Sequence, residues 1–169
     1  MLFRSLALSI KASEIINKEF GFRIKIKNIK KALSRISLPG RLQLIERNPI
    51  KIIDTAHNVH AISNLVKNLK IFLKGRKINF LIGMLKDKKP KVCIEIIKEI
   101  SNKIYLVNVP HNRSFDANKL VQRLDDKNVK FVCDEDIQKI INYKRTLVIT
   151  GSNYLIGYLL SKYIKLKKF

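Results

Sequence analysis

The sequence is poor in glycine, cysteine and long apolar runs, and each shortage excludes a class of protein. Its 169 residues include six glycines, and none of these belongs to a glycine-rich loop of the kind that cradles nucleotide phosphates. Cys93 and Cys133 lie far apart without metal-ligand spacing, so we expect both to be core residues in a reducing compartment. No run approaches the roughly 20 apolar residues of a membrane span. Because the apolar start is interrupted at Lys11 and lacks a cleavage site, we predict a cytoplasmic protein without a membrane partner.

Acidic residues are also scarce. The chain has 13 Asp and Glu against 35 Lys and Arg, a net charge of +22. Such a charge usually indicates nucleic acid or an anionic surface, but here basic residues alternate with apolar ones along most helices, and no nucleic-acid-binding motif appears. We therefore interpret the charge as a solvated surface. A basic nucleic-acid binder is the less favoured alternative, and it predicts salt-dependent binding to any duplex.

The histidines do not form a metal site. His57, His60 and His111 do not form a metal-binding signature, and neither a cysteine nor a further ligand accompanies them. We therefore predict no metal ligands in this chain.

The chain does contain an apolar segment that ends in polar side chains. Residues 50–53 are rich in isoleucine and predict a short buried strand, and residues 61–73 repeat apolar side chains at helical spacing. Asp54 and His57 lie in the turn between them. In an open parallel sheet this turn lies at the carboxyl end of the strand, where such folds bind ligands.

The same order of strand, polar turn and helix recurs three more times. Strands are expected at residues 77–81, 104–109 and 146–149, and helices at residues 90–100, 117–124 and 154–165. If the sheet is parallel, all the turns converge at one edge. One cleft would then collect Asp54, His57, Asp87, Arg113 and Ser152. Each polar turn by itself is explained by turn and cap formation, but four at one edge favour a ligand site.

The chain before residue 38 has a different pattern. Helices are expected at residues 5–20, ended by Gly21, and at residues 29–36, before a first strand at residues 42–45. We divide the chain into a helical lead-in, residues 1–37, left from an interdomain region, and one α/β domain, residues 38–169. For this domain we predict a Rossmann-like, three-layer fold with a mostly parallel sheet of about six strands and helices on both faces.

Five motifs follow one another in this domain. They are Leu-Pro-Gly-Arg at 38–41, Asp-Thr-Ala-His-Asn-Val-His-Ala at 54–61, Gly-Met-Leu-Lys-Asp-Lys at 83–88, Arg-Ser at 113–114 and Thr-Gly-Ser-Asn-Tyr-Leu-Ile-Gly at 150–157. In this order they resemble the carboxyl-terminal domain of the bifunctional folylpolyglutamate synthase and dihydrofolate synthase, within the Mur ligase family. The resemblance covers the chain from about Ser5 to its end, and implies the fold of that domain.

The resemblance also implies an activity. Family members use ATP and Mg²⁺ to convert a dihydropteroate or folate carboxylate into an acyl phosphate, which the amine of L-glutamate then attacks. By resemblance, Arg41 and Asp54 contact ATP, since the guanidinium suits phosphate and the carboxylate suits a nucleoside hydroxyl or amino group. His57 and Asp87 match catalytic-region positions. Ser152 and Arg113 are candidates on the substrate side.

The chain departs from the family pattern in four respects, one of which is that Ser5 lies near the position of an ATP-contacting asparagine of the family. Val59 stands where the family usually has proline, and Lys89 stands where it has a second acidic residue. The amino-terminal domain, with its phosphate loop, magnesium ligands and pterin pocket, is missing. We therefore expect a fragment or one half of a split ligase, inactive without a separate amino-terminal domain. The alternative is a noncatalytic remnant or nucleotide-binding module.

Overall fold

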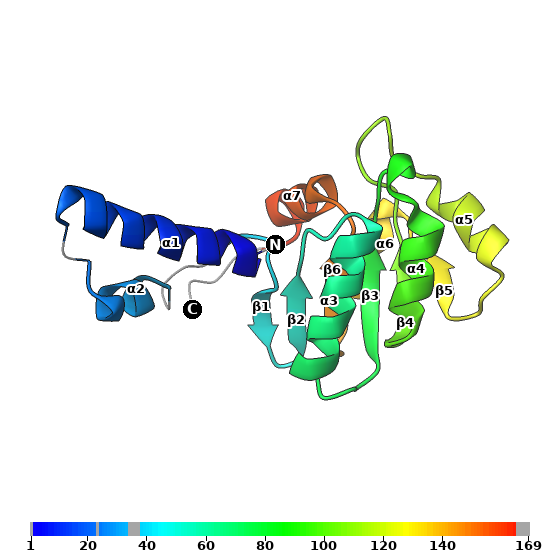
Figure 1. The fold of residues 1–169 in the computed structure, drawn as a ribbon. Coiled ribbons are helices and arrows are strands. Elements are labelled where there is room, and N and C mark those ends of the chain that lie inside the picture. The colour runs from blue at the N-terminus through cyan, green and yellow to red at the C-terminus, as the bar shows by residue number, and fades with distance from the viewer. Residues whose placement is uncertain (1, 23, 34–37, 165–169) are drawn as a thin grey trace. The chain divides into compact units, whose positions relative to one another are not determined.

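The computed structural model describes residues 2–22, 24–33 and 38–164. The chain forms two compact units, Met1–Leu38 and Pro39–Phe169. The helices of the first unit are α1 (Leu2–Phe20) and α2 (Ile26–Leu33) (Figure 1). Gly21 has a φ of +67°, which suits glycine at the end of a helix.

The turn after α1 is held by one side chain. The carboxamide of Asn17 accepts a hydrogen bond from Ile24 N at 2.8 Å and donates one to Ile24 O at 3.0 Å. The helix expected at residues 29–36 begins earlier than predicted, at Ile26. The last residues of that prediction, 34–36, lie outside the described part of the chain.

A single sheet organises the second unit. Its six strands lie in the order β1-β2-β6-β3-β4-β5 (Figure 1). Their bounds are β1 Gln43–Arg47, β2 Ile50–Ile53, β3 Ile78–Ile82, β4 Ser101–Leu106, β5 Val129–Phe131 and β6 Leu147–Thr150. β1 pairs antiparallel with β2, and the other neighbouring pairs are parallel. The prediction of a mostly parallel sheet of about six strands is confirmed.

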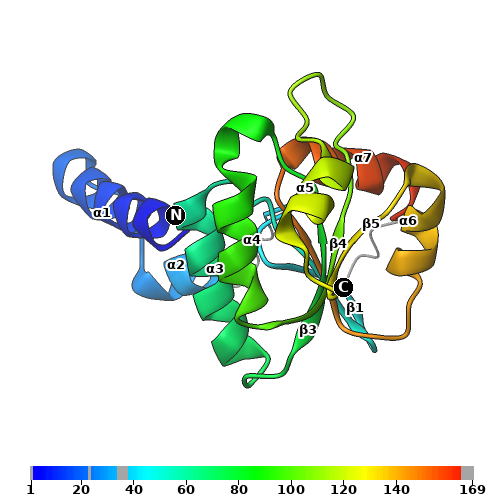
Figure 2. The same cartoon turned by 90° about the vertical axis from the view of Figure 1, so that its right-hand side faces the viewer.

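Helices cover both faces of this sheet. The helices of this unit are α3 (Val59–Phe72), α4 (Pro90–Lys98), α5 (Ala117–Leu124), α6 (Asp134–Ile141) and α7 (Asn153–Lys162), with a 3-10 turn at Lys86–Lys88. Figure 2 shows α3 and α4 on one side of the sheet, with α6 and α7 on the other. The sequence pattern did not predict α6. Residue 165, the expected end of α7, lies outside the described residues.

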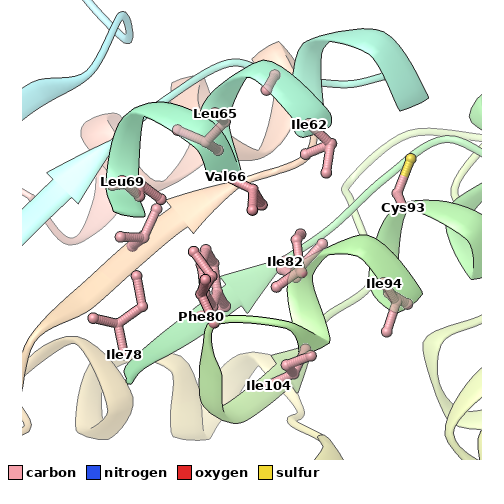
Figure 3. Packing of buried hydrophobic residues seen from close by; sticks show 14 of the residues in the cluster. Ile62, Leu65, Val66, Leu69, Ile78, Phe80, Ile82, Cys93, Ile94 and Ile104 are labelled. Carbon is pink, nitrogen blue, oxygen red and sulfur yellow. The ribbon is translucent and has the colours of Figure 1, made fainter. Parts of the chain in front are cut away.

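The core consists of two apolar clusters, one on each face. Phe80 and Ile82 of β3 pack with Ile62 and Cys93 from the helices on one face (Figure 3), while Leu81 joins the cluster on the other. Successive strand residues point to opposite faces, so a strand covered on both sides is apolar throughout. Burial of each large side chain contributes roughly 1.5–3 kcal/mol, which holds the strands and helices together.

The two cysteines lie in different environments. Cys93 is buried in the core, and burial raises the pKa of its thiol to about 11. The expectation that Cys133 is also a core residue is wrong, because Cys133 is exposed just before α6 and its thiol donates to Asp136 Oδ2 at 3.3 Å. No helix in the described part of the chain is long and apolar enough to cross a membrane.

Candidate functional site

The turns that follow β2, β3, β4 and β6 lie at the carboxyl edge of the parallel strands, the upper edge of the sheet in Figure 1. Along the chain the strands run outward from β3 to β4 and β5, and the chain then returns to place β6 between β2 and β3. The strand order therefore reverses between β3 and β6. In open α/β sheets, ligands bind in the crevice outside the carboxyl ends of the strands at this point.

Asp54 joins the turn after β2 to the turn that contains Arg41. Its Oδ2 atom accepts a hydrogen bond from Leu42 N at 2.8 Å, and its Oδ1 atom accepts one from Ala56 N at 2.8 Å. The carboxylate thus fixes the backbone next to Arg41, whose side chain is exposed. Two motifs that lie 12 residues apart in the sequence form one structural unit.

Close packing in this unit requires a glycine. Gly40 has a φ of +67°, and a Cβ atom at this position would lie 2.7 Å from Thr55 Cγ2. Thr55 N also donates to Gly40 O at 2.8 Å. Glycine adopts positive φ at no steric cost, so it allows the Arg41 turn to pack directly on the turn after β2.

Burial and hydrogen bonding act in opposite directions on the pKa of Asp54. Burial raises the pKa of its carboxyl group, and the hydrogen bonds from Leu42 N and Ala56 N together with the charge of Arg41 oppose that rise. Asp54 is 8% exposed. A carboxylate oxygen accepts more than one hydrogen bond, so Asp54 retains acceptor capacity beyond the two backbone contacts.

His57 lies half-buried in the same turn. Its Nδ1 atom is 2.9 Å from the carbonyl oxygen of Thr55, so we assign the proton to Nδ1, which leaves Nε2 as an acceptor. Asn58 then caps α3 by accepting from Ala61 N at 2.9 Å. Val59 is the first helical residue, a position that proline also suits, so this departure from the family pattern does not disturb the helix.

The turn after β6 is bonded to the turn after β2. The carbonyl oxygen of Ala56 accepts from Gly151 N at 2.9 Å and from Thr150 Oγ1 at 3.2 Å. A Cβ atom on Gly151 would lie 2.6 Å from the carbonyl oxygen of Gly83, at the start of the turn after β3. The turns after β2, β3 and β6 are therefore in direct contact. Ser152, 3% exposed, caps α7 by accepting from Tyr154 N at 3.1 Å.

Asp87 and Arg113 lie in a second pair of linked turns. Lys86 N donates to Arg113 O at 2.9 Å, and Phe115 N donates to Met84 O at 3.1 Å. Asp87 is exposed and pairs with Lys88 at 2.8 Å. The hydrogen bond from Lys88, with the charge of Arg113, lowers the pKa of Asp87, so this group is a carboxylate at neutral pH.

These contacts connect the predicted residues in two groups. Arg41, Asp54 and His57 adjoin the turn of Ser152, whereas the turn of Asp87 is hydrogen-bonded to the turn of Arg113. The turns that carry both groups meet where Gly83 contacts Gly151.

Sequence reasoning missed a nearby hollow of about 350 Å³, between the turn after β3 and α5. Lys86, Lys119 and Arg123 line it together with Asp116. The four-residue spacing of Lys119 and Arg123, which places both on one helix face, was the available signal. In the described residues, no group of three His, Cys, Asp or Glu side chains is placed to hold a metal ion.

Comparison with known proteins finds a family match over most of the second unit. Residues 40–155 match the glutamate ligase domain of Mur ligases. The dihydrofolate synthase/folylpolyglutamate synthase of Buchnera aphidicola subsp. Schizaphis graminum is 30% identical over 146 residues, which are 83% of this chain and 35% of that protein. The chain thus spans about a third of this relative.

Solved structures of similar proteins have a similar fold. The folylpolyglutamate synthase of Thermotoga maritima has a TM-score of 0.72 at 29% identity, covering 87% of this chain and 36% of its own. A bifunctional folylpolyglutamate synthase/dihydrofolate synthase with Mn, AMPPNP and L-glutamate bound has a TM-score of 0.70 at 25% identity, covering 83% of this chain and 35% of its own.

Proposed function

Because this chain belongs to the Mur ligase family through its glutamate ligase domain, we propose that it takes part in ATP-dependent ligation of L-glutamate to dihydropteroate or a folate. The observation that carries the proposal is the hydrogen-bonded unit of Asp54 and the Arg41 turn, at the carboxyl edge of the sheet within the matched region. The Buchnera relative is named for both ligase activities.

We assign ATP contacts to Arg41 and Asp54. The exposed guanidinium of Arg41 presents a planar set of donors that binds two phosphate oxygens at once. Asp54 acts first as a positioning residue, because both of its oxygens hold backbone N–H groups. Its remaining acceptor sites suit a hydroxyl or amino group of the nucleoside.

The other candidates are assigned to the reacting groups. In the proposed reaction, a substrate carboxylate oxygen attacks the γ-phosphorus of ATP and ADP leaves; the glutamate nitrogen then attacks the acyl carbon, and phosphate leaves. The nitrogen must lose protons, and His57 Nε2 is an acceptor at this edge. We assign Asp87 to the same catalytic region, and Arg113 and Ser152 to the substrate side.

The phosphate loop must come from other residues. The 169 residues contain no glycine-rich phosphate loop, and the described ones offer no group of three metal-binding side chains. We propose that residues beyond these, in the same polypeptide or a separate one, supply the phosphate loop and most Mg²⁺ ligands, and that residues 1–37 belong to the connection between the two domains.

A reconstitution assay tests this function. Glutamate ligation with ATP and dihydropteroate or tetrahydrofolate is measured for this chain alone and mixed with the amino-terminal domain of a related ligase. We expect activity in the mixture. Arg41→Ala should reduce it about tenfold to a hundredfold, because a hydrogen bond to a charged group contributes about 1.5–3 kcal/mol. Asp54→Asn should also reduce it, because Leu42 N and Ala56 N donate to different oxygens of Asp54 and one of these atoms becomes an NH2 donor in asparagine.

Lys67→Ala is the control variant. Lys67 is exposed on α3, away from the carboxyl edge, and its removal should leave ligation unchanged. An equal loss in all three variants would contradict the assigned roles. A folded chain with no activity in any mixture would favour a noncatalytic remnant.

A further inference from the structure

The opposite edge of the sheet, where the parallel strands begin, contains a basic groove of about 540 Å³. Its cations come from the last residue of β1 and from the turns that precede β3 and β6. Arg47 precedes β2, Arg76 and Lys77 precede β3, and Lys144 and Arg145 precede β6. The turns before β2 and β3 lie at the lower edge of the sheet in Figure 1. Residues far apart in the sequence therefore form one positively charged surface.

The charge of this basic groove is not neutralised locally. Of the described residues that line it, none is acidic. The carboxylates nearest in sequence are bound elsewhere, since Glu46 pairs with Lys51 at 2.6 Å and Glu99 pairs with Lys70 at 2.7 Å. The groove therefore attracts anions, and its field is focused by the protein around it.

Most of these cations are available to a ligand. No hydrogen bond or ion pair joins the side chains of Arg76, Lys144 and Arg145 to other residues in the described ranges, and all three are exposed. Lys77 Nζ donates to the backbone carbonyl of Glu99 at 2.8 Å, a neutral acceptor that leaves its charge uncompensated. Binding an anion would not require breaking an existing ion pair at these side chains.

The rest of the lining limits the kind of anion. Asn102 Nδ2 donates to Asn79 Oδ1 at 3.1 Å, so amides lie beside the cations. None of the described lining residues is aromatic, so the groove lacks the rings on which nucleic-acid bases stack. A ligand is therefore recognised through its charged oxygens.

We propose that this basic groove binds a compact polyphosphate anion through Arg76, Lys144 and Arg145. A guanidinium donates two parallel hydrogen bonds to a phosphate, and cations on separate turns match a ligand with several phosphate groups. The proposal does not depend on the ligase function, because the groove lies at the other end of the strands from Asp54 and Asp87.

Inorganic tripolyphosphate is the probe. It is titrated into the full chain while backbone amide shifts are followed by NMR. We expect saturable shifts at residues 76–77 and 144–146, and none at residues 54–58. The double variant Arg76→Gln/Arg145→Gln should bind about tenfold more weakly or worse. Both side chains are exposed, so thermal unfolding should be unchanged.

The double variant Lys67→Gln/Lys130→Gln removes the same charge from exposed positions outside the groove. It should change the affinity less than about twofold, because distant charges are screened by salt. Equal weakening by both double variants, or shifts spread over the whole surface, would show nonspecific attraction and overturn the proposal.

A uridine dodecamer distinguishes the source of the phosphates. Each phosphate contact to a single strand contributes about 0.7 to the slope of log affinity against log salt, so loss of both arginines should lower that slope by about 1.4. If the dodecamer shifts the same amides and the groove variant lowers the slope by this amount, the phosphates are those of single-stranded nucleic acid. If tripolyphosphate alone binds there, the ligand is a compact polyphosphate. The site is refuted if tripolyphosphate causes no amide shifts at the groove residues and the dodecamer binds elsewhere on the protein.

Discussion

At the scale of single residues, Gly40 shows how the backbone positions an exposed neighbouring side chain, that of Arg41. Its positive φ and its approach to Thr55 let the Arg41 turn pack on the turn after β2, which contains Asp54. The position of the exposed Arg41 therefore depends on its neighbour Gly40, which has no side chain. Glycine is required here for both conformation and space.

Gly40→Ala should destabilise the fold. The left-handed conformation costs a non-glycine residue about 1–2 kcal/mol, and the new Cβ atom would lie 2.7 Å from Thr55 Cγ2. We expect the free energy of unfolding to fall by at least about 1–2 kcal/mol, measured by urea denaturation.

Gly157→Ala is the matched control. Gly157 lies inside α7, and a Cβ atom there has no heavy atom within 4 Å. Alanine is favoured over glycine in a helix by about 1 kcal/mol, so this variant should be more stable than the parent. A loss of stability in both variants would disprove the argument from local geometry.

At the scale of elements, Asp134 connects the first turn of α6 to α7. Its carboxylate accepts from Tyr158 Oη at 2.6 Å and from Lys162 Nζ at 2.9 Å. These contacts lower the pKa of Asp134, with the hydrogen bond from Lys162 as the largest cause. A carboxylate in the first turn also interacts favourably with the helix dipole.

Asp134→Asn should lower stability by about 1 kcal/mol at neutral pH, because half-exposed charged contacts contribute little more. The folded pKa lies below the ordinary value of 3.8. The stabilisation is therefore complete above pH 3.8 and is lost as the pH falls through the folded pKa. Thermal unfolding as a function of pH should show the two proteins converging in acid.

Glu135→Gln provides the comparison. Glu135 also lies in the first turn of α6, so this variant loses the same charge near the helix end but keeps the contacts of Asp134 with α7. It should be destabilised less than Asp134→Asn. If the two variants were equally affected, the helix dipole would account for the whole effect.

At the scale of the whole molecule, the two units are unequal. Both apolar clusters, with the side chains packed against them, come from residues between 44 and 164. The unit Met1–Leu38 contributes none of these described core residues. The second unit therefore contains the burial that stabilises an independent fold.

A chain shortened to residues 39–169 should fold by itself. We expect one cooperative thermal transition within a few degrees of the full chain, because both core clusters remain intact. Circular dichroism and backbone NMR check this. Loss of cooperative unfolding would show that the first 38 residues are part of the same folding unit.

The sequence by itself determined the local elements and the order of the motifs. Four strands followed by polar turns and helices could be placed because apolar periodicity depends on neighbouring residues. The prediction missed α6, whose eight residues begin with three acidic ones, and it missed the exposure of Cys133, which lies just before that helix.

Tertiary structure alone decided which turns meet. The insertion of β6 between β2 and β3, the bond from Leu42 N to Asp54, and the grouping of Arg76 with Arg145 all join residues distant in the sequence. Sequence patterns indicate which face of a helix or strand is apolar. They do not record strand order, because that order minimises exposed apolar surface over the whole chain at once.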